Sequence, residues 1–397
     1  MAVFELRSPL APEERLFKRK LIVRDVIALV SLFVITGALA VLTYFLFNSF
    51  LHRRQALTQT WLREGENAMA SGHPEEAVDA FRSALEYGPA QRETEAKLAM
   101  ALSAAGREQE AVSYFNTLLE SEPGNGQMNL ELARIAAKQR NESRAVEYYQ
   151  RALDGTWQGD GYARRRAVRL ELARYLIAAG DYARARSQLL TSAGNAPDDP
   201  GIKMEIADLM EKAQDPADAL EIYRSIAERS PGRIEALEGA GRVALAMGRF
   251  NLARAYLEEA VRHPDFASQP ESVRLQYSQM LADTIQLLNL FPAANLDVGQ
   301  RAQRILHAAT TAQTRLAACT ANGTSQDPQL AGLATKWQQI PAKLTPADLA
   351  RAPQLEQSIM NLVYSTEFET ERTCGTPTGE DLLYLKIAKS PLAAGQQ

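Results

Sequence analysis

The segment GHPEEAVDAFRSALEYGP, Gly72 to Pro89, carries a residue pattern that recurs along much of the chain. A glycine and a proline frame apolar residues at helical spacing, which predicts one amphipathic helix after a turn. The small residue of this helix returns every 34 residues, and the interval resumes after an insertion of six residues: Ala77, Ala111, Ala145, Ala185, Ala219 and Ala253. Six units in one register predict a repeat protein.

Three other features recur in register with these alanines. A large apolar residue follows each alanine by four positions: Phe81, Phe115, Tyr149, Leu189, Tyr223 and Leu257. A small residue precedes each by twelve: Gly65, Ala99, Ala133, Ala173, Ala207 and Gly241. Four units end in proline (Pro89, Pro123, Pro197, Pro231), and four have a glycine at mid-unit (Gly72, Gly106, Gly180, Gly248). Each unit therefore predicts a helix, a tight turn and a second helix that proline ends. One hairpin cannot bury its apolar face alone, so the units should stack into a superhelix.

The units resemble the tetratricopeptide repeat family. The match is clearest in the first unit, in Trp61, Gly65, Gly72, Ala77, Phe81, Ala84 and Pro89. This unit departs from the family pattern at Glu64 and Ala68, and the third unit has Trp157 where proline is expected. The resemblance implies an all-α fold with six repeats, over residues 58–91, 92–125, 126–159, 166–199, 200–233 and 234–267.

The resemblance also implies a concave groove lined by the first helix of each repeat. Five positions of each such helix would face it, and in this sequence they include Leu62, Glu66, Met69, Met100, Leu130, Arg134, Lys138, Leu170, Arg174, Ile177, Met204, Asp208, Glu238, Arg242 and Leu245. Leucine and methionine beside arginine would suit an amphipathic or extended peptide with acidic residues. The lysine and asparagine set with which some arrays of this family grip C-terminal carboxylates is absent. The alternative for each residue is ordinary surface, or packing between repeats.

The insertion between the third and fourth repeats is WQGDGYARRRAVR, Trp157 to Arg169. Its glycines predict a loop. Its arginines form a basic patch at the start of the next helix: Arg164, Arg165, Arg166 and Arg169. The patch is either an ordinary solvated helix end or a docking site for an anionic partner, such as an acidic peptide or a lipid headgroup.

Residues 26–47, VIALVSLFVITGALAVLTYFLF, are 22 residues without a charge. At ~1.5 Å per helical residue they span a hydrocarbon core of ~30 Å, which predicts a transmembrane helix in contact with the lipid bilayer. A cleaved signal peptide is the alternative, but its apolar region is normally ~7–15 residues long. No small-x-small cleavage site follows the run either.

Positive charges on the two flanks predict the orientation. Residues 10–25 contain five and residues 48–63 contain three: Arg15, Lys18, Arg19, Lys20 and Arg24, against Arg53, Arg54 and Arg63. This favours residues 1–25 in the cytoplasm and the remainder outside it, with residues 48–57 as a juxtamembrane linker. We therefore expect a single-pass protein of a bacterial-type inner membrane with periplasmic repeats.

The repeat register stops at residue 267, and residues 268–397 still read as helical. Repeat arrays need an atypical end to cover their last apolar face, so a cap is one interpretation of this extension and a docking module is the other. Both cysteines, Cys319 and Cys374, lie in it. They could form one disulfide, as a periplasmic location would allow, or be two unrelated thiols.

Composition and motifs argue against several classes of protein. A net charge of −4 does not favour nucleic-acid binding. The histidines are dispersed, HExxH and CxxC are missing, and so are the glycine-rich phosphate loops and GxSxG, so we expect no metal, no cofactor and no enzyme.

The sequence thus predicts a membrane-anchored scaffold that binds other proteins at the membrane surface, in the assembly or organisation of envelope or membrane complexes. One alternative is a permanent accessory subunit of a larger membrane complex. The other is an enzyme with its site in residues 268–397.

Overall fold

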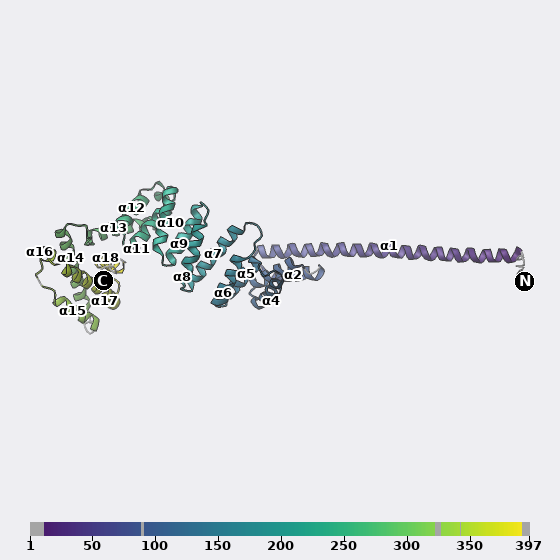
Figure 1. Cartoon of the computed structure of the whole chain (residues 1–397), viewed down its shortest axis with the longest axis horizontal. Helices are drawn as coiled ribbons and strands as arrows, with labels where there is room; N and C mark the ends of the chain where they lie inside the picture. The colour runs from purple at the N-terminus through teal and green to yellow at the C-terminus, as the bar shows by residue number, and fades with distance from the viewer. Residues whose placement is uncertain (1–11, 89–90, 322–326, 342, 391–397) are drawn as a thin grey trace, which may run out of the picture. The chain divides into compact units, whose positions relative to one another are not determined.

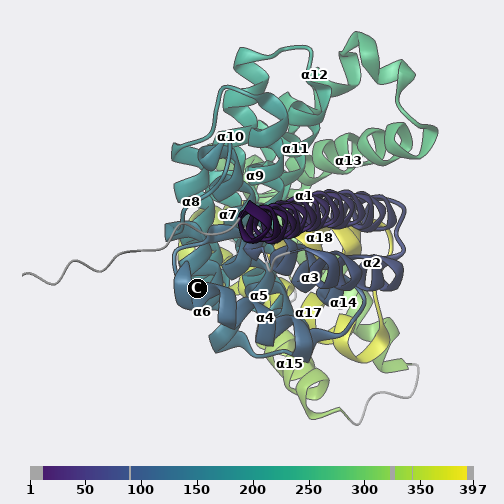
Figure 2. The same cartoon turned by 90° about the vertical axis from the view of Figure 1, so that its right-hand side faces the viewer.

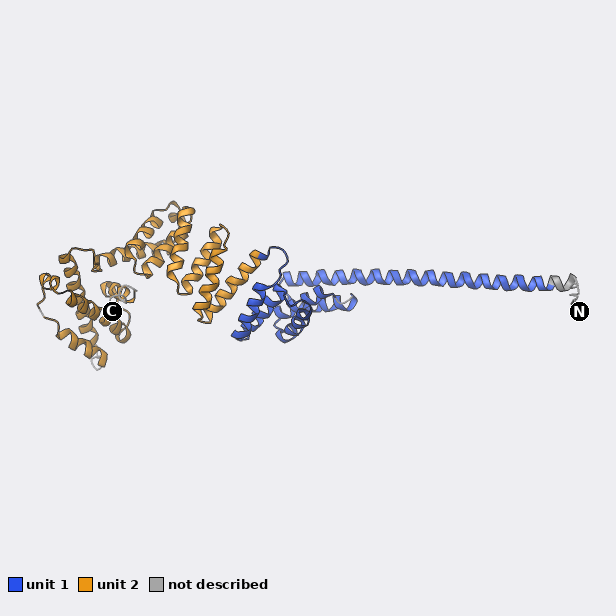
Figure 3. Cartoon of the chain, in the orientation of Figure 1, with its two compact units in different colours: residues 1–161 blue, residues 162–397 orange. Residues whose placement is uncertain are grey.

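The computed structural model describes residues 12–88, 91–321, 327–341 and 343–390, and the side chains from residue 17 onward. Within these residues the secondary structure is eighteen α-helices and one 3-10 turn, as the sequence predicted (Figure 1). The chain forms two compact units, residues 1–161 and 162–397 (Figure 3). Pro89 and residues 1–11 of the expected cytoplasmic segment lie outside the described residues.

The first unit contains three helical hairpins. They are formed by α1 (Pro12–Ala70) with α2 (Pro74–Tyr87), α3 (Arg92–Ala104) with α4 (Glu108–Ser121), and α5 (Gly126–Lys138) with α6 (Glu142–Asp154). Each helix contacts the next one along the chain, which is the stacking that the 34-residue period predicts.

α1 is one unbroken helix of 59 residues. It joins the apolar run, residues 48–57 and the first helix of the first repeat, because residues 48–57 contain no glycine or proline that would end a helix. Large apolar side chains along it are exposed, Phe33 at 82%. It is the one helix among the described residues that is long and apolar enough to cross a membrane.

The recurring small and large residues pack against each other within each hairpin. Ala77 and Phe81 are buried in α2, and a Cβ atom on Gly65 would lie 2.5 Å from the Phe81 ring. In the sixth repeat a Cβ on Gly241 would lie 2.7 Å from Leu257. The absence of a side chain at these glycines therefore lets the two helices of a hairpin approach closely.

The turn between the two helices of a hairpin needs a positive φ angle. Gly72 supplies it in the first repeat with φ +77°, and three later repeats use glycine at the same position. The third and fifth repeats have Arg140 and Gln214 there, with φ of 56° and 59°. Helix packing thus imposes the turn even where the residue disfavours it.

The third repeat replaces its closing proline with a packed tryptophan. Trp157 donates a hydrogen bond from Nε1 to the carbonyl of Ala152 at 2.9 Å. A Cβ on Gly126 would lie 2.4 Å from the Trp157 ring, so this glycine provides the space for it. The indole therefore closes the repeat against the start of α5.

The second unit begins with three further hairpins. They are α7 (Gly161–Ala178) with α8 (Tyr182–Gly194), α9 (Pro200–Lys212) with α10 (Pro216–Arg229), and α11 (Ile234–Ala246) with α12 (Phe250–Arg262). In Figure 2 these hairpins lie one after another, as their labels show. Aspartates cap the starts of α8, α9 and α10 by accepting backbone N–H bonds.

The C-terminal extension continues this stack. It contains η1 (Pro264–Ser268), α13 (Glu271–Leu290), α14 (Val298–Cys319), α15 (Pro328–Gln338), α16 (Pro346–Ala350), α17 (Pro353–Cys374) and α18 (Gly379–Lys389). α13 packs on α12, and the rings of Phe250 and Phe291 meet edge to face at 5.8 Å. Phe250 of the last repeat belongs to the same buried cluster as the extension, so the extension covers the last apolar face of the repeats.

Candidate functional site

The first helices of the hairpins carry the residues of the expected groove. Five of these side chains are exposed: Glu66, Arg134, Lys138, Arg174 and Asp208. Seven are half-buried: Leu62, Met69, Met100, Ile177, Met204, Arg242 and Leu245. These twelve keep at least part of their surface exposed.

The structure corrects the expectation for three other groove residues. Leu130, Leu170 and Glu238 are each only 5% exposed. The two leucines pack between helices, because an apolar side chain on a close-packed helix face gains more from burial than from exposure. They are core residues and do not line a groove.

Ion pairs link the first helices of neighbouring repeats at a constant sequence separation of 31 residues. Lys97 donates to Glu66 at 2.7 Å in the first unit, and in the second unit Arg174 pairs with Glu205 and Arg242 with Glu211. A residue and the one 31 positions earlier therefore face each other across adjacent first helices. Opposite charges recur at this separation of 31 residues in the sequence, a signal that the 34-residue period does not contain.

These pairs change what the groove can bind. The Arg174 and Arg242 charges are already compensated by carboxylates, and Arg134 pairs with Glu131 at 2.9 Å on its own helix. An acidic peptide would have to compete with these intramolecular partners. The prediction of an acidic ligand for the groove is weakened accordingly.

A polar cluster lies between α9, α10 and α11 in the second unit. The Tyr223 hydroxyl donates to Asp208 at 2.5 Å, and a Cβ on Gly239 would lie 2.7 Å from the Tyr223 ring. Burial and the neighbouring Asp208 carboxylate raise the pKa of Tyr223, so its hydroxyl stays a donor. Gly239 thus lets an aromatic side chain reach a groove carboxylate.

Glu238 lies beside this cluster with one carboxylate oxygen, Oε1, buried and without a hydrogen-bond partner. Burial raises its pKa to about 7; Glu235 adds to the rise and Arg242 opposes it. The carboxyl group is therefore largely protonated in mildly acidic solution.

The predicted basic patch lies in the first turns of α7. Arg164 is exposed, while Arg165, Arg166 and Arg169 are half-buried. Arg164 and Arg165 already take part in interactions within the chain. The patch is thus partly committed to the fold, and anion docking there stays a prediction.

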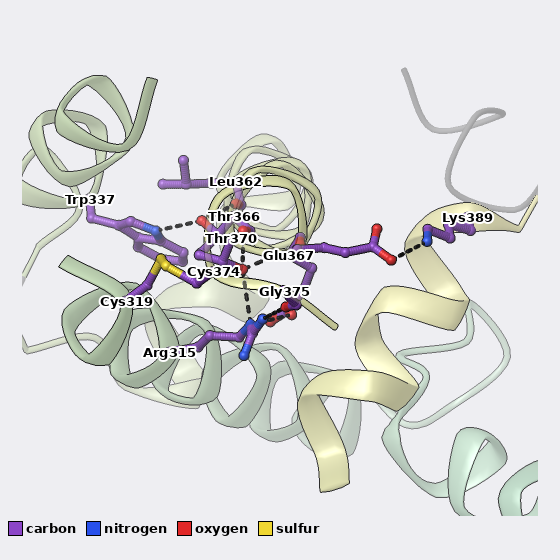
Figure 4. Close-up of polar contacts among 11 residues, drawn as sticks. Arg315, Cys319, Trp337, Leu362, Thr366, Glu367, Thr370, Cys374, Gly375 and Lys389 are labelled. Carbon is purple, nitrogen blue, oxygen red and sulfur yellow. Dashed lines mark hydrogen bonds and ion pairs between the residues drawn. A yellow bond between two sulfur atoms is a disulfide. The ribbon is translucent and has the colours of Figure 1, made fainter. Parts of the chain in front are cut away.

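A second polar cluster joins α14 to α17 in the extension (Figure 4). Cys319 and Cys374 form a disulfide with their Cα atoms 5.9 Å apart, a pairing that the sequence left open. Beside it Arg315 donates to Thr370 Oγ1 at 2.9 Å and to the carbonyl of Gly375 at 2.8 Å. These contacts hold the ends of the two helices together.

Glu367 is fully buried in this cluster. Its nearest cation is Arg315, with Nε 3.6 Å from Oε2. Burial raises the pKa of Glu367 to about 8; Asp381 adds to the rise and Arg315 opposes it.

No group of histidine, cysteine, aspartate and glutamate side chains in the described part of the chain could hold a metal ion.

Comparison with known families agrees with this architecture. Two family models, each described as a tetratricopeptide repeat, match the chain, one over residues 62–116, 96–160 and 170–234 and the other over residues 211–268. The chain therefore contains tetratricopeptide repeats, which confirms that part of the sequence prediction. Repeats of this kind mediate protein–protein interactions.

Several solved structures are similar to this chain. PilF of Pseudomonas aeruginosa is 20% identical over 57% of this chain and 98% of its own, with a TM-score of 0.38. Part of a repeat-containing protein of Cytophaga hutchinsonii is 14% identical over 62% of this chain and 92% of its own, with a TM-score of 0.44. PilW, described as a type IV pilus biogenesis factor, is 16% identical over 57% of this chain and 98% of its own, with a TM-score of 0.38. No curated protein matches the chain.

Proposed function

We propose that the protein is a membrane-anchored scaffold whose repeats bind other proteins at the membrane surface, outside the cytoplasm. Its role would be the assembly or organisation of membrane or envelope complexes. Proteins built from tetratricopeptide repeats are typically scaffolds without catalytic activity, which is in keeping with this role.

The observation that carries the proposal is the continuity of α1. An apolar, uncharged and exposed stretch leads without a break into the first repeat. In water this stretch would expose a large apolar surface, whereas a bilayer would cover it. The disulfide between Cys319 and Cys374 suits an oxidising compartment and thereby supports the predicted orientation.

The orientation is tested by protease treatment of spheroplasts with an intact cytoplasmic membrane. Residues after the span should be digested from outside, leaving a membrane fragment that begins before residue 26. Digestion only after the membrane is opened would contradict the proposed orientation. Release of the full-length chain by alkaline carbonate would contradict the anchor itself.

A permanent subunit of a larger complex is the second candidate function, because the extension is larger than a cap requires. Native purification of the tagged full-length chain in mild detergent, with mass spectrometry, separates the two candidates. A fixed stoichiometric set of partners indicates a subunit, whereas a scatter of substoichiometric clients indicates an adaptor. In the adaptor case, replacing exposed groove residues such as Arg134 and Lys138 should reduce client recovery.

A further inference from the structure

A pocket of about 360 Å³ lies in the extension, and its lining mixes apolar surface with polar side chains. It is bounded by the end of α13, the first half of α14 and the middle of α18. The side chains that matter for its chemistry are Asn289, Gln300, Gln303, Arg304, His307 and Tyr384. The pocket is large enough for one or two side chains of a bound peptide, at the low end of ligand sites in general.

The lining is rich in hydrogen-bond donors. The amides of Asn289, Gln300 and Gln303 are exposed to solvent, and no hydrogen bond within the described residues engages these side chains. No carboxylate lines the pocket. Glu380 lies beside the lining, with Oε2 2.8 Å from His307 Nε2, and makes no ion pair with Arg304.

Arg304 supplies a fixed positive charge. Its Nη1 donates to the carbonyls of Leu288 and Phe291, both at 2.7 Å, which caps the end of α13 and holds the guanidinium in place. The two other arginines of α14 with ion pairs are Arg301, bonded to Glu356 at 2.9 Å, and Arg315, facing Glu367. Within the described residues, Arg304 has no such carboxylate.

Tyr384 lies at the buried side of the pocket. It is fully buried, and its hydroxyl has no hydrogen-bond partner in the described part of the chain. Burial raises the pKa of this phenol, so the hydroxyl remains protonated, and its ring closes the inner end of the pocket. The pocket therefore combines a fixed guanidinium with three unengaged amides.

From this arrangement we infer that the pocket binds a carboxylate of a peptide segment, held by Arg304 and the surrounding amide donors. A charged hydrogen bond from a positioned guanidinium is the strongest contact the pocket can offer, and a carboxylate is its natural complement. The carboxylate comes either from an acidic side chain or from the end of a chain. This site is separate from the groove of the repeats and does not depend on it.

The test is isothermal titration of the full-length protein in detergent micelles with short acetylated peptides. The probes are amidated tri-glutamate, amidated tri-glutamine, tri-glutamine with a free carboxyl terminus, and inorganic phosphate. We expect binding of a carboxylate-bearing probe and none of amidated tri-glutamine. Tri-glutamate alone would identify side-chain recognition, and the free terminus alone would identify chain-end recognition.

Two variants locate the binding. Arg304→Gln should weaken it at least about tenfold, because the charged hydrogen bond is lost. Since this change also releases two backbone carbonyls, Gln303→Glu provides an independent variant. It places a repelling carboxylate at an exposed position of the pocket and should weaken binding by a similar factor.

The matched controls are Gln303→Ala and Arg351→Gln. Gln303→Ala removes one amide without adding charge and should cost less than about threefold. Arg351 is exposed in the same extension and outside the pocket, so its replacement should leave binding unchanged. Equal binding of all peptides, tighter binding of phosphate, or insensitivity to Arg304→Gln and Gln303→Glu would overturn the inference.

Discussion

Single residues decide how closely the helices of this protein approach one another. The sequence predicted the small and large positions of each hairpin from their period alone, and Gly65 and Phe81 meet as that pattern requires. It did not predict the role of Gly239, which leaves room for Tyr223 to reach Asp208. That contact depends on two neighbouring hairpins at once, and the period of one hairpin does not contain it.

Gly239→Ala tests this contact. The new methyl group would lie 2.7 Å from a ring that its hydrogen bond to Asp208 holds in place, so we expect a loss of ~1–3 kcal/mol in the free energy of unfolding. Gly332→Ala in α15 is the control, because its methyl group meets nothing within 4 Å. That change should stabilise by up to ~1 kcal/mol through helix propensity. Urea denaturation measures both, and equal effects of the two would contradict the packing argument.

Glu238 makes stability depend on pH. Its folded-state pKa of about 7 lies above the ordinary value of 4.5, so the folded state holds the proton more tightly than the unfolded state. Below pH 4.5 the carboxyl group is protonated in both the folded and the unfolded state, so it does not lower the free energy of unfolding. As the pH rises to 7, the unfolded state ionises first and the free energy of unfolding falls progressively. Glu238→Gln should therefore raise stability at pH 8 by up to ~3 kcal/mol and change little at pH 4.

The measurement for Glu238 is urea denaturation of both proteins at several pH values. Glu235, Arg242 and Tyr277 face this carboxyl group and remain in the variant, so the difference between the two curves isolates Glu238. A constant difference across the pH range would show that the pKa of Glu238 is the same in the folded and unfolded states, which contradicts the raised value.

At the scale of the helices, the sequence predicted every hairpin of the repeats but not the continuity of α1. Turn residues mark the ends of α2 to α12, whereas nothing in residues 48–57 distinguishes a linker from a helix. The sequence also offered no means to tell buried from exposed leucines on the first helices. Leu130 and Leu170 occupy expected groove positions, and the packing of the neighbouring helices buries them.

His52→Pro tests the continuity of α1. Proline removes one backbone hydrogen bond and crowds the preceding turn, at a cost of ~3 kcal/mol within a helix. We expect trypsin to cleave after Arg53 or Arg54 at least about tenfold faster than in the parent protein. His52→Ala keeps the helix and should show the parent rate. Rapid cleavage of the parent protein itself would contradict an unbroken α1.

At the scale of the whole molecule, the period predicted the fold class and the number of repeats. The arrangement of residues 268–390 could not be predicted in the same way, because that part of the chain has no period. Its core depends on contacts between α14 and α17, whose joined cysteines are 55 residues apart. Arg304 and Arg315 look alike in the sequence. Only the packing shows that Arg315 faces the buried Glu367 and that Arg304 lines a pocket.

Reduction of the disulfide should loosen the extension and spare the repeats. Closing a loop with a separation of 55 residues stabilises by ~4 kcal/mol in the chain-entropy model. Hydrogen exchange followed by mass spectrometry should show faster exchange in α14 to α18 after reduction and little change in α1 to α10. The double variant Cys319→Ser and Cys374→Ser should not respond to the reductant. A uniform response of the whole chain would contradict a local role for the bond.

The unbroken α1 also has a consequence for direction. With residues 26–47 in the bilayer as proposed, α1 continues as one helix from the membrane into the first repeat. The number of residues in 48–57 then sets the direction in which Glu66 and Met69 point around the membrane normal. One inserted residue would turn these side chains by ~100°, and seven, almost two full turns, would nearly restore them. The number of residues between the membrane and the first repeat therefore specifies an angle as well as a height, and any partner fixed in the same membrane would respond to both.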